Sequence, residues 1–334
     1  MTASEKRVGI RDVAKAAGLS ITTVSFALNG KGQVAEATRQ RVRDVAKELG
    51  YQPNQAARSL KSGRSRIIGI AVSHRESRPW RQTYLPYYRS IIAGAAIEAV
   101  EHGHAVAAIP FDAHGHVEAA LPFDGLIVVD PVKNDPTLAA CVRDRIPVVV
   151  DGRPLDEHLG GIPGVQSDVH GGMGEVLSHY ASREVTRPAL LTGSAVDAYT
   201  LDTERSFRAW CRRRGLPSTI RKVKAGEQPL DAANDLLDRD PRVDAVHALN
   251  QTYGEAVLAA AAQRRLSIPE DLVVTMMGES ASAASGNGVS YLVLDPAEVG
   301  ATCVRMLVDL LDGKAVTDVM LPCRFVVSDR DLTR

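Results

Sequence analysis

The sequence predicts an α/β protein with three parts: a small, all-helical helix-turn-helix head (residues 1–50), a hinge segment (51–66) and a two-lobed α/β body with parallel sheets (67–334). Three observations predict this organisation. Basic residues are concentrated near the N-terminus, apolar residues recur at helical spacing over the first fifty positions, and strand-like and helix-like segments alternate through the rest.

Charge divides the chain, although the formal net charge of its 334 residues is zero. Residues 1–66 contain 13 Lys and Arg against 5 Asp and Glu, a net of +8, and the remaining residues carry 27 basic and 35 acidic side chains, a net of −8. This asymmetry is typical of a basic nucleic-acid-binding head on an acidic body. On charge alone, a solvated basic surface without a ligand explains it equally well.

Targeting and redox signals favour a cytoplasmic protein. The N-terminus has no apolar stretch of the kind that a secretory signal needs, and no apolar run approaches the ~20 residues that span a bilayer. The four cysteines are scattered without metal-ligand spacing, so we expect them to be reduced. We therefore expect no membrane contact, no metal and no cofactor.

The head contains three helical patterns. The first ends at Gly18, the second begins after Ser20, and the third ends at Gly50. A turn from Asn29 to Gly32 follows the second pattern. Two short helices joined by a short Gly-containing turn fit a helix-turn-helix, in which the second helix enters the DNA major groove. A bare pattern of this kind is a weak signal, because it also marks small helical cores.

The combined motifs are more specific than the bare pattern. In order, the sequence carries DVAKAAGLSITTVSFALNG, RQRVRDVAKELGYQPNQAARSL and IGI. Residues 8–70 thereby resemble the lactose-repressor (LacI/GalR) family of bacterial transcription regulators. The resemblance implies a homodimeric, sequence-specific repressor of double-stranded operator DNA, controlled by a small-molecule effector such as a carbohydrate or related metabolite. A regulator without an effector, a small-molecule-binding protein and an enzyme are the alternatives.

The resemblance implies roles for the second head helix. Its base-reading positions are Ile21, Thr22 and Phe26. Many family members carry a long polar or Arg side chain where this chain has Phe26, which either contacts a thymine methyl or the sugar-phosphate wall, or completes the core of the head. The candidates for contacts that set the register on the DNA backbone are Ser20, Thr23, Ser25 and Asn29.

The composition of the hinge is typical of a flexible basic linker. The resemblance instead implies a helix that orders on operator DNA, pairs with its partner's copy and enters the minor groove. Leu60 matches the family's leucine wedge, Ala57 matches its small neighbour, and Lys61 lies along the groove. The predicted hinge contacts are Asn54, Ala57, Arg58, Leu60 and Lys61.

The body alternates eight strand-like runs with helical stretches, which indicates parallel sheets covered on both faces. About 268 residues exceed what one sheet comfortably holds, so we expect two lobes. The family's core resembles periplasmic sugar-binding proteins. Its chain path implies a periplasmic-binding-protein-like body with lobe one at about 67–163 and 295–321, and lobe two at about 164–294 and 322–334. The ligand would bind between them, at the carboxyl ends of the strands.

Ligand candidates follow from these strand ends. Asp151 matches the family's aspartate at the cleft, although a strand-end Asp is also a common turn cap. Asn250 matches a ligand-contacting Asn, and the loop after the first strand supplies two aromatic platforms. Two family positions are altered, because an Arg and an Asp align with Thr203 and Gly278. The predicted ligand residues are Trp80, Tyr84, Asp151, Thr203, Arg205, Asn250 and Glu279.

Signals for catalysis are weak. The glycines of VHGGMGEVL, residues 169–177, lack the spacing of dinucleotide or P-loop motifs. Four histidines, His102, His104, His114 and His116, have no Cys or carboxylate to complete a metal set, so we interpret them as surface residues. No leucine heptads follow the last strand pattern, which favours a dimer over a tail-linked tetramer. The sequence favours a regulator over an enzyme.

Overall fold

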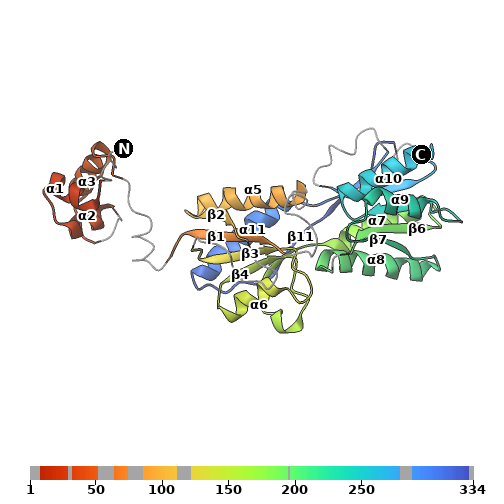
Figure 1. Ribbon diagram of the computed structural model, residues 1–334, viewed down its shortest axis with the longest axis horizontal. Helices are drawn as coiled ribbons and strands as arrows, with labels where there is room; N and C mark the ends of the chain where they lie inside the picture. The colour runs from red at the N-terminus through yellow and green to blue at the C-terminus, as the bar shows by residue number, and fades with distance from the viewer. Residues whose placement is uncertain are drawn as a thin grey trace. The chain divides into compact units, whose positions relative to one another are not determined.

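The computed structural model describes residues 8–28, 32–51, 64–73, 86–110, 122–194, 196–278 and 288–330 (Figure 1). The chain forms two compact units, Met1–Ser65 and Arg66–Arg334. Within the described ranges, no helix is both long and apolar enough to cross a membrane.

The head contains the helices α1 (Ile10–Ala17), α2 (Ile21–Leu28) and α3 (Glu36–Glu48). Gly18 ends α1 in the left-handed conformation, with φ of 65°, which glycine adopts without strain. The small core of the head consists of Val13, Ala14, Ala17, Val24, Ala27, Val42 and Ala46. The predicted helical head is therefore confirmed.

Lobe one is built on an entirely parallel sheet with the strand order β11-β5-β4-β3-β1-β2. Its strands are β1 (Ile67–Val72), β2 (Ala105–Ala108), β3 (Gly125–Val129), β4 (Val148–Asp151), β5 (Gly164–Ser167) and β11 (Val319–Leu321). The 3₁₀ helix η2 (Glu157–Leu159) precedes β5. Helices α5 (Pro86–Glu101) and α11 (Pro296–Leu311) cover one face, and α6 (Pro136–Arg143) covers the other (Figure 1).

Glycines bring α5 and α11 close together. A Cβ added at Gly94 would meet the backbone of Ala297, and one added at Gly300 would meet the backbone of Ile91. The two helices therefore pack as one layer over sheet one.

Lobe two repeats the arrangement with the strand order β12-β10-β9-β8-β6-β7, in which only β12 is antiparallel. Its strands are β6 (Pro188–Gly193), β7 (Thr219–Val223), β8 (Ala245–Ala248), β9 (Val273–Gly278), β10 (Ser290–Val293) and β12 (Arg324–Val326). Helices α7 (Val169–Ser182) and α8 (Ala198–Arg214) pack on one face, and α9 (Pro229–Leu237) and α10 (Gln251–Gln263) on the other. The predicted two-lobed α/β class is confirmed.

The chain passes between the lobes at three places. It leaves sheet one after β5, returns between β10 and α11, and leaves again between β11 and β12. The sequence prediction put residue 164 in lobe two, but β5 pairs with β4 and β11 in sheet one, so the first crossing lies after Ser167. The strands β5 and β7 were not predicted, because neither shows a strong apolar run, and helix α9 was missed although its apolar residues follow helical spacing.

Candidate DNA-binding and effector sites

Helix α2 combines a capped N-terminus with an exposed face. Its first turn is held by Ser20, whose Oγ accepts a hydrogen bond from the Thr23 amide at 3.1 Å and lies 2.8 Å from the Thr23 hydroxyl. Val24 and Ala27 are buried in the head core. Ile21 and Phe26 are 46% and 39% exposed. The apolar side chains of this helix therefore divide between the core and the outer surface.

The other predicted DNA contacts are placed as follows. Thr22 is exposed, and Thr23 and Ser25 are half-buried. Asn29, Asn54, Ala57, Arg58, Leu60 and Lys61 lie outside the described residues, so their roles stay predictions.

A cavity of about 90 Å³ lies where the two lobes of the body meet, at the carboxyl ends of the strands. An adjoining cavity of about 30 Å³ shares Tyr87, Asp130 and Tyr199 with it. Lobe one lines them with Tyr87, Tyr88, Asp130, Asp151 and Gln166, and lobe two with Asp197, Tyr199, Thr200, Asp202, Asn250, Gln251 and Gly278. The lining thus comes from segments far apart in the sequence.

On the lobe-one side, carboxylates pair with tyrosine hydroxyls. Asp151, the last residue of β4, is only 4% exposed and accepts from the Tyr87 hydroxyl at 3.1 and 3.3 Å. The Tyr88 hydroxyl donates to Asp130 Oδ2 at 2.7 Å. Burial, reinforced by the negative charges of Asp151 and Asp130, raises the pKa of Tyr87 well above its ordinary value. Tyr87 therefore stays a hydrogen-bond donor.

On the lobe-two side, the lining residues cap helices. Asn250 Oδ1 accepts from the Tyr253 amide at 2.9 Å at the start of α10. Asp197 accepts from the Thr200 amide at 2.7 Å and the Thr200 hydroxyl at 3.1 Å at the start of α8. These caps fix both side chains at the cavity wall, because each is held to a helix terminus.

Direct contacts join the lobes beside the cavities. Arg153, which follows β4, donates from Nη2 to both carboxylate oxygens of Asp202 in α8, at 2.7 and 2.9 Å. The Lys133 amide donates to the Val196 carbonyl at 3.1 Å, next to a backbone bridge between Val132 and Asp197. Within the described part of the body, the Arg153–Asp202 ion pair and a short stretch of paired backbone thus tie lobe one to lobe two.

The predicted ligand residues fall into three groups. Asp151 and Asn250 line the cavities. Thr203 does not line the cavities, because it is fully buried and its hydroxyl donates to the Tyr199 carbonyl at 2.9 Å. The side chain of Arg205 is 75% exposed and lies 3.5 Å from Asp202. Trp80, Tyr84 and Glu279 lie outside the described residues.

Several cavity residues were missed by sequence reasoning. Asp130 follows the buried strand β3 as Asp151 ends β4, so the same strand-end argument would have found it. Tyr87 and Tyr88 end the aromatic stretch from which only Trp80 and Tyr84 were chosen. Asp197, Tyr199 and Asp202 carried no signal in the sequence.

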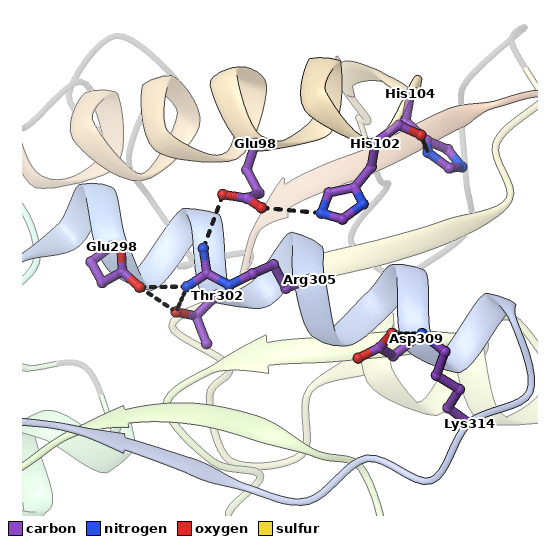
Figure 2. A network of polar contacts seen from close by, with 8 residues as sticks. All are labelled: Glu98, His102, His104, Glu298, Thr302, Arg305, Asp309 and Lys314. Carbon is purple, nitrogen blue, oxygen red and sulfur yellow. Dashed lines mark hydrogen bonds and ion pairs between the residues drawn. The ribbon is translucent and has the colours of Figure 1, made fainter.

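The histidine-rich patch lies away from the cavities, on the surface of lobe one. His102 pairs with Glu98 through Nε2 at 3.1 Å, and His104 Nδ1 lies 3.0 Å from the His102 carbonyl (Figure 2). Arg305 of α11 also reaches Glu98, at 2.9 Å, and so links α11 to α5. His114 and His116 lie outside the described residues.

A helix-turn-helix head joined to a two-lobed body with a cavity between the lobes is the organisation expected of a ligand-responsive DNA-binding protein. Family models agree with this division. Residues 9–54 match bacterial regulatory proteins of the lacI family, and residues 177–328 match a periplasmic binding protein-like domain.

Known proteins resemble the chain over nearly its whole length. It is 28% identical over 327 residues to the HTH-type transcriptional regulator CelR of Thermobifida fusca, covering 95% of each chain. It is 26% identical over 333 residues to the ribose operon repressor of Bacillus subtilis, covering 95% of this chain and 96% of that protein. The head thus matches the LacI family of bacterial regulatory proteins, and these two relatives, which the chain resembles over nearly its whole length, are transcriptional regulators.

Solved structures share the fold. A lac repressor dimer bound to operator and an anti-inducer matches with a TM-score of 0.79 and 21% identity, covering 96% of this chain and 98% of that one. A CelR–cellobiose complex matches with a TM-score of 0.68 and 24% identity, covering 96% and 99%.

Proposed function

We propose that this protein is a homodimeric repressor of the LacI family that binds operator DNA through α2 and its hinge, and that a neutral, polyhydroxylated effector in the inter-lobe cavity controls it. The observation that carries the effector proposal is the pairing of Asp151 with Tyr87 and of Asp130 with Tyr88 at the cavity wall. DNA binding places its action in the compartment of the chromosome, the cytoplasm.

The chemistry of the lining favours a sugar-like ligand. Among the described lining residues, the charged side chains are all aspartates, namely Asp130, Asp151, Asp197 and Asp202. Carboxylates accept hydrogen bonds from hydroxyl groups and repel phosphate and carboxylate ligands. Tyrosine rings beside them provide apolar surface for the carbon face of a sugar. The solved CelR relative was complexed with cellobiose, which supports the same class of effector.

The dimer proposal rests on the outer surface of lobe one. Ile97 and Val100 on α5 are each 70% exposed, a large exposure for two apolar side chains one helical turn apart. A second copy of the chain would cover this face. The solved lac repressor with the same fold was determined as a dimer on operator, which supports this assignment.

Two binding measurements test the proposal. Full-length protein is used to select bound fragments from genomic DNA, and the affinity for a selected fragment is measured by fluorescence anisotropy from 50 to 200 mM salt. We expect about a thousandfold weakening, because contacts to ~6 or more phosphates release counterions. A salt-independent affinity, or no selected fragment, would contradict the DNA part.

The effector part is tested by calorimetric titration of the DNA-free protein with neutral mono- and disaccharides and with their phosphorylated forms. We expect a neutral sugar to bind and to change the affinity for the selected fragment. Binding of phosphorylated sugars alone would contradict the carboxylate argument. No binding at all, with DNA binding intact, would favour a regulator without an effector.

A further inference from the structure

Helix α2 lacks the side chains that usually recognise bases through hydrogen bonds. From Ser20 to Leu28, the sequence SITTVSFAL contains no Arg, Lys, Asn or Gln. Guanine and adenine are read in the major groove chiefly by bidentate contacts from those side chains. The largest exposed side chains of this helix are instead apolar, Ile21 and Phe26, with Thr22 between them in sequence.

The ring of Phe26 packs against a backbone segment that is itself held by hydrogen bonds. A Cβ added at Gly32 would lie 2.8 Å from Phe26 Cδ2, so the ring lies against the backbone of Gly32, which has a φ of 71°. The side chain of Arg39 fixes this segment, because Nη2 donates to the Gly32 carbonyl and Nε to the Val34 carbonyl, both at 3.1 Å. Phe26 is therefore held in position at the surface while Val24 and Ala27 fill the core.

We propose that Phe26 and Ile21 determine specificity by contacting thymine methyl groups in the operator major groove, and that Arg39 acts as a positioning residue through Gly32. This inference rests on the proposed DNA binding by α2. The C5 methyl of thymine is the one apolar group on a base edge in that groove, so an apolar reader selects it. Placing one methyl against apolar surface strengthens binding by about fourfold per thymine.

Deoxyuridine tests the proposal cleanly, because it keeps every hydrogen-bonding group of thymine and lacks only the methyl. Full-length protein first selects a duplex from a random pool, and each thymine of that duplex is then replaced singly by deoxyuridine. We expect about fourfold weaker binding at one or more thymines of each half-site, and no change at thymines outside it.

Variants test whether Phe26 and Arg39 cause the difference in affinity between the thymine and deoxyuridine duplexes. Phe26→Ala should bind the thymine and deoxyuridine duplexes alike at the position that Phe26 contacts, and Phe26→Leu should keep part of the difference. Arg39→Lys keeps the charge but loses the two-pronged contact to the loop, so the thymine-to-deoxyuridine ratio should fall towards one. Thermal melting of each variant without DNA checks that the head remains folded.

The possible results distinguish DNA binding by the protein from recognition of thymine methyl groups by Phe26. If a duplex is selected but wild type binds every deoxyuridine version equally, DNA binding stands and methyl reading is overturned. If the ratio persists in Phe26→Ala, the methyl is read elsewhere and the assignment to Phe26 is overturned. If no duplex is selected, the proposed function itself fails, and this inference fails with it.

Discussion

Lobe one and lobe two repeat one strand order, yet they distribute polar and apolar side chains in opposite ways. Among the described residues, the large exposed hydrophobic side chains of lobe one are Ile97, Val100, Val142 and Met320, whereas lobe two exposes only Val196, in the segment before α8. The outer surface of lobe one therefore carries apolar area that the outer surface of lobe two does not.

The interiors differ in the opposite sense. Fully buried polar side chains lie within sheet two, among them His247 in β8 and Thr275 in β9. His247 Nδ1 lies 2.9 Å from Thr275 Oγ1, which is 2.8 Å from the Tyr180 hydroxyl. His247 Nε2 is buried without a hydrogen-bond partner among the described residues. In sheet one, the described buried polar strand residue is Asp151, at the cavity.

This difference shows that a shared fold does not impose a shared selection of side chains. Lobe one has an apolar sheet interior and exposed apolar side chains on its outer surface, whereas lobe two has a chain of hydrogen-bonded polar side chains inside its sheet and a more polar surface. The lobes should accordingly respond to different perturbations: association should depend on lobe one, and acid stability on lobe two.

The largest effect is expected on the surface of lobe one. Ile97→Lys combined with Val100→Lys should weaken dimerisation by about a thousandfold or more, because apolar burial is lost from both copies and like charges are brought together. Sedimentation velocity across a concentration series measures the change. Val142→Lys, at a 52% exposed position on α6, is the matched control and should leave the dimer intact. If the double variant stays dimeric, α5 does not form part of the dimer interface.

The second effect concerns acid stability and lobe two. Burial lowers the pKa of His247 to about 4 from an ordinary value of 6.5, so the unfolded chain binds more protons between these pH values. The contribution of His247 to stability is therefore complete above about pH 6.5 and is lost as the pH falls towards 4, by about 3 kcal/mol in total.

Urea unfolding from pH 7 to 4, followed by the fluorescence of Trp210 in the same lobe, measures this loss. In His247→Leu, the part of the pH dependence that lies between pH 6.5 and 4 should shrink by a similar amount. An unchanged pH dependence in that variant would mean that His247 is not the group that titrates.

The third effect compares the two walls of the cavity. Asp151→Asn keeps the shape and an acceptor for the Tyr87 hydroxyl but loses the charge, so it should weaken effector binding by about ten- to a hundredfold. Operator affinity without effector should hardly change. Asn250→Asp, the reciprocal change on the lobe-two wall, retains the helix cap and should affect binding less. Calorimetric titration separates the two, and equal effects would contradict the greater role of lobe one.

The smallest effect is expected for the ion pair that joins the lobes. The side chains of Arg153 and Asp202 are 31% and 28% exposed, so the pair contributes about 0.2–1 kcal/mol. Asp202→Asn should therefore change effector affinity by at most about fivefold. Exchange of the two residues, Arg153→Asp with Asp202→Arg, should restore most of it. Failure of the exchange to restore affinity would show that Asp202 contacts the ligand instead of the other lobe.

The sequence by itself determined the elements with strong local signals. Helical spacing with Gly18 and Ser20 as boundaries defined the head, and buried apolar runs located β1 and β4. Asp151 was predicted at the cavity because it ends such a run and matches the family's aspartate, and parallel strands end at a common edge, so its place followed from the sequence.

Tertiary structure alone decided the rest. The run GVQS of β5 is short and partly polar, and its sheet is set by pairing with β4 and β11, the latter more than 150 residues away in the sequence. In α8, Thr203 is in the core while Asp202 lines the cavity, because successive residues on a helix point about 100° apart and a shift of one position exchanges the two environments. Which side of a helix faces a cavity depends on how the lobes pack, and that packing is not encoded in any one segment.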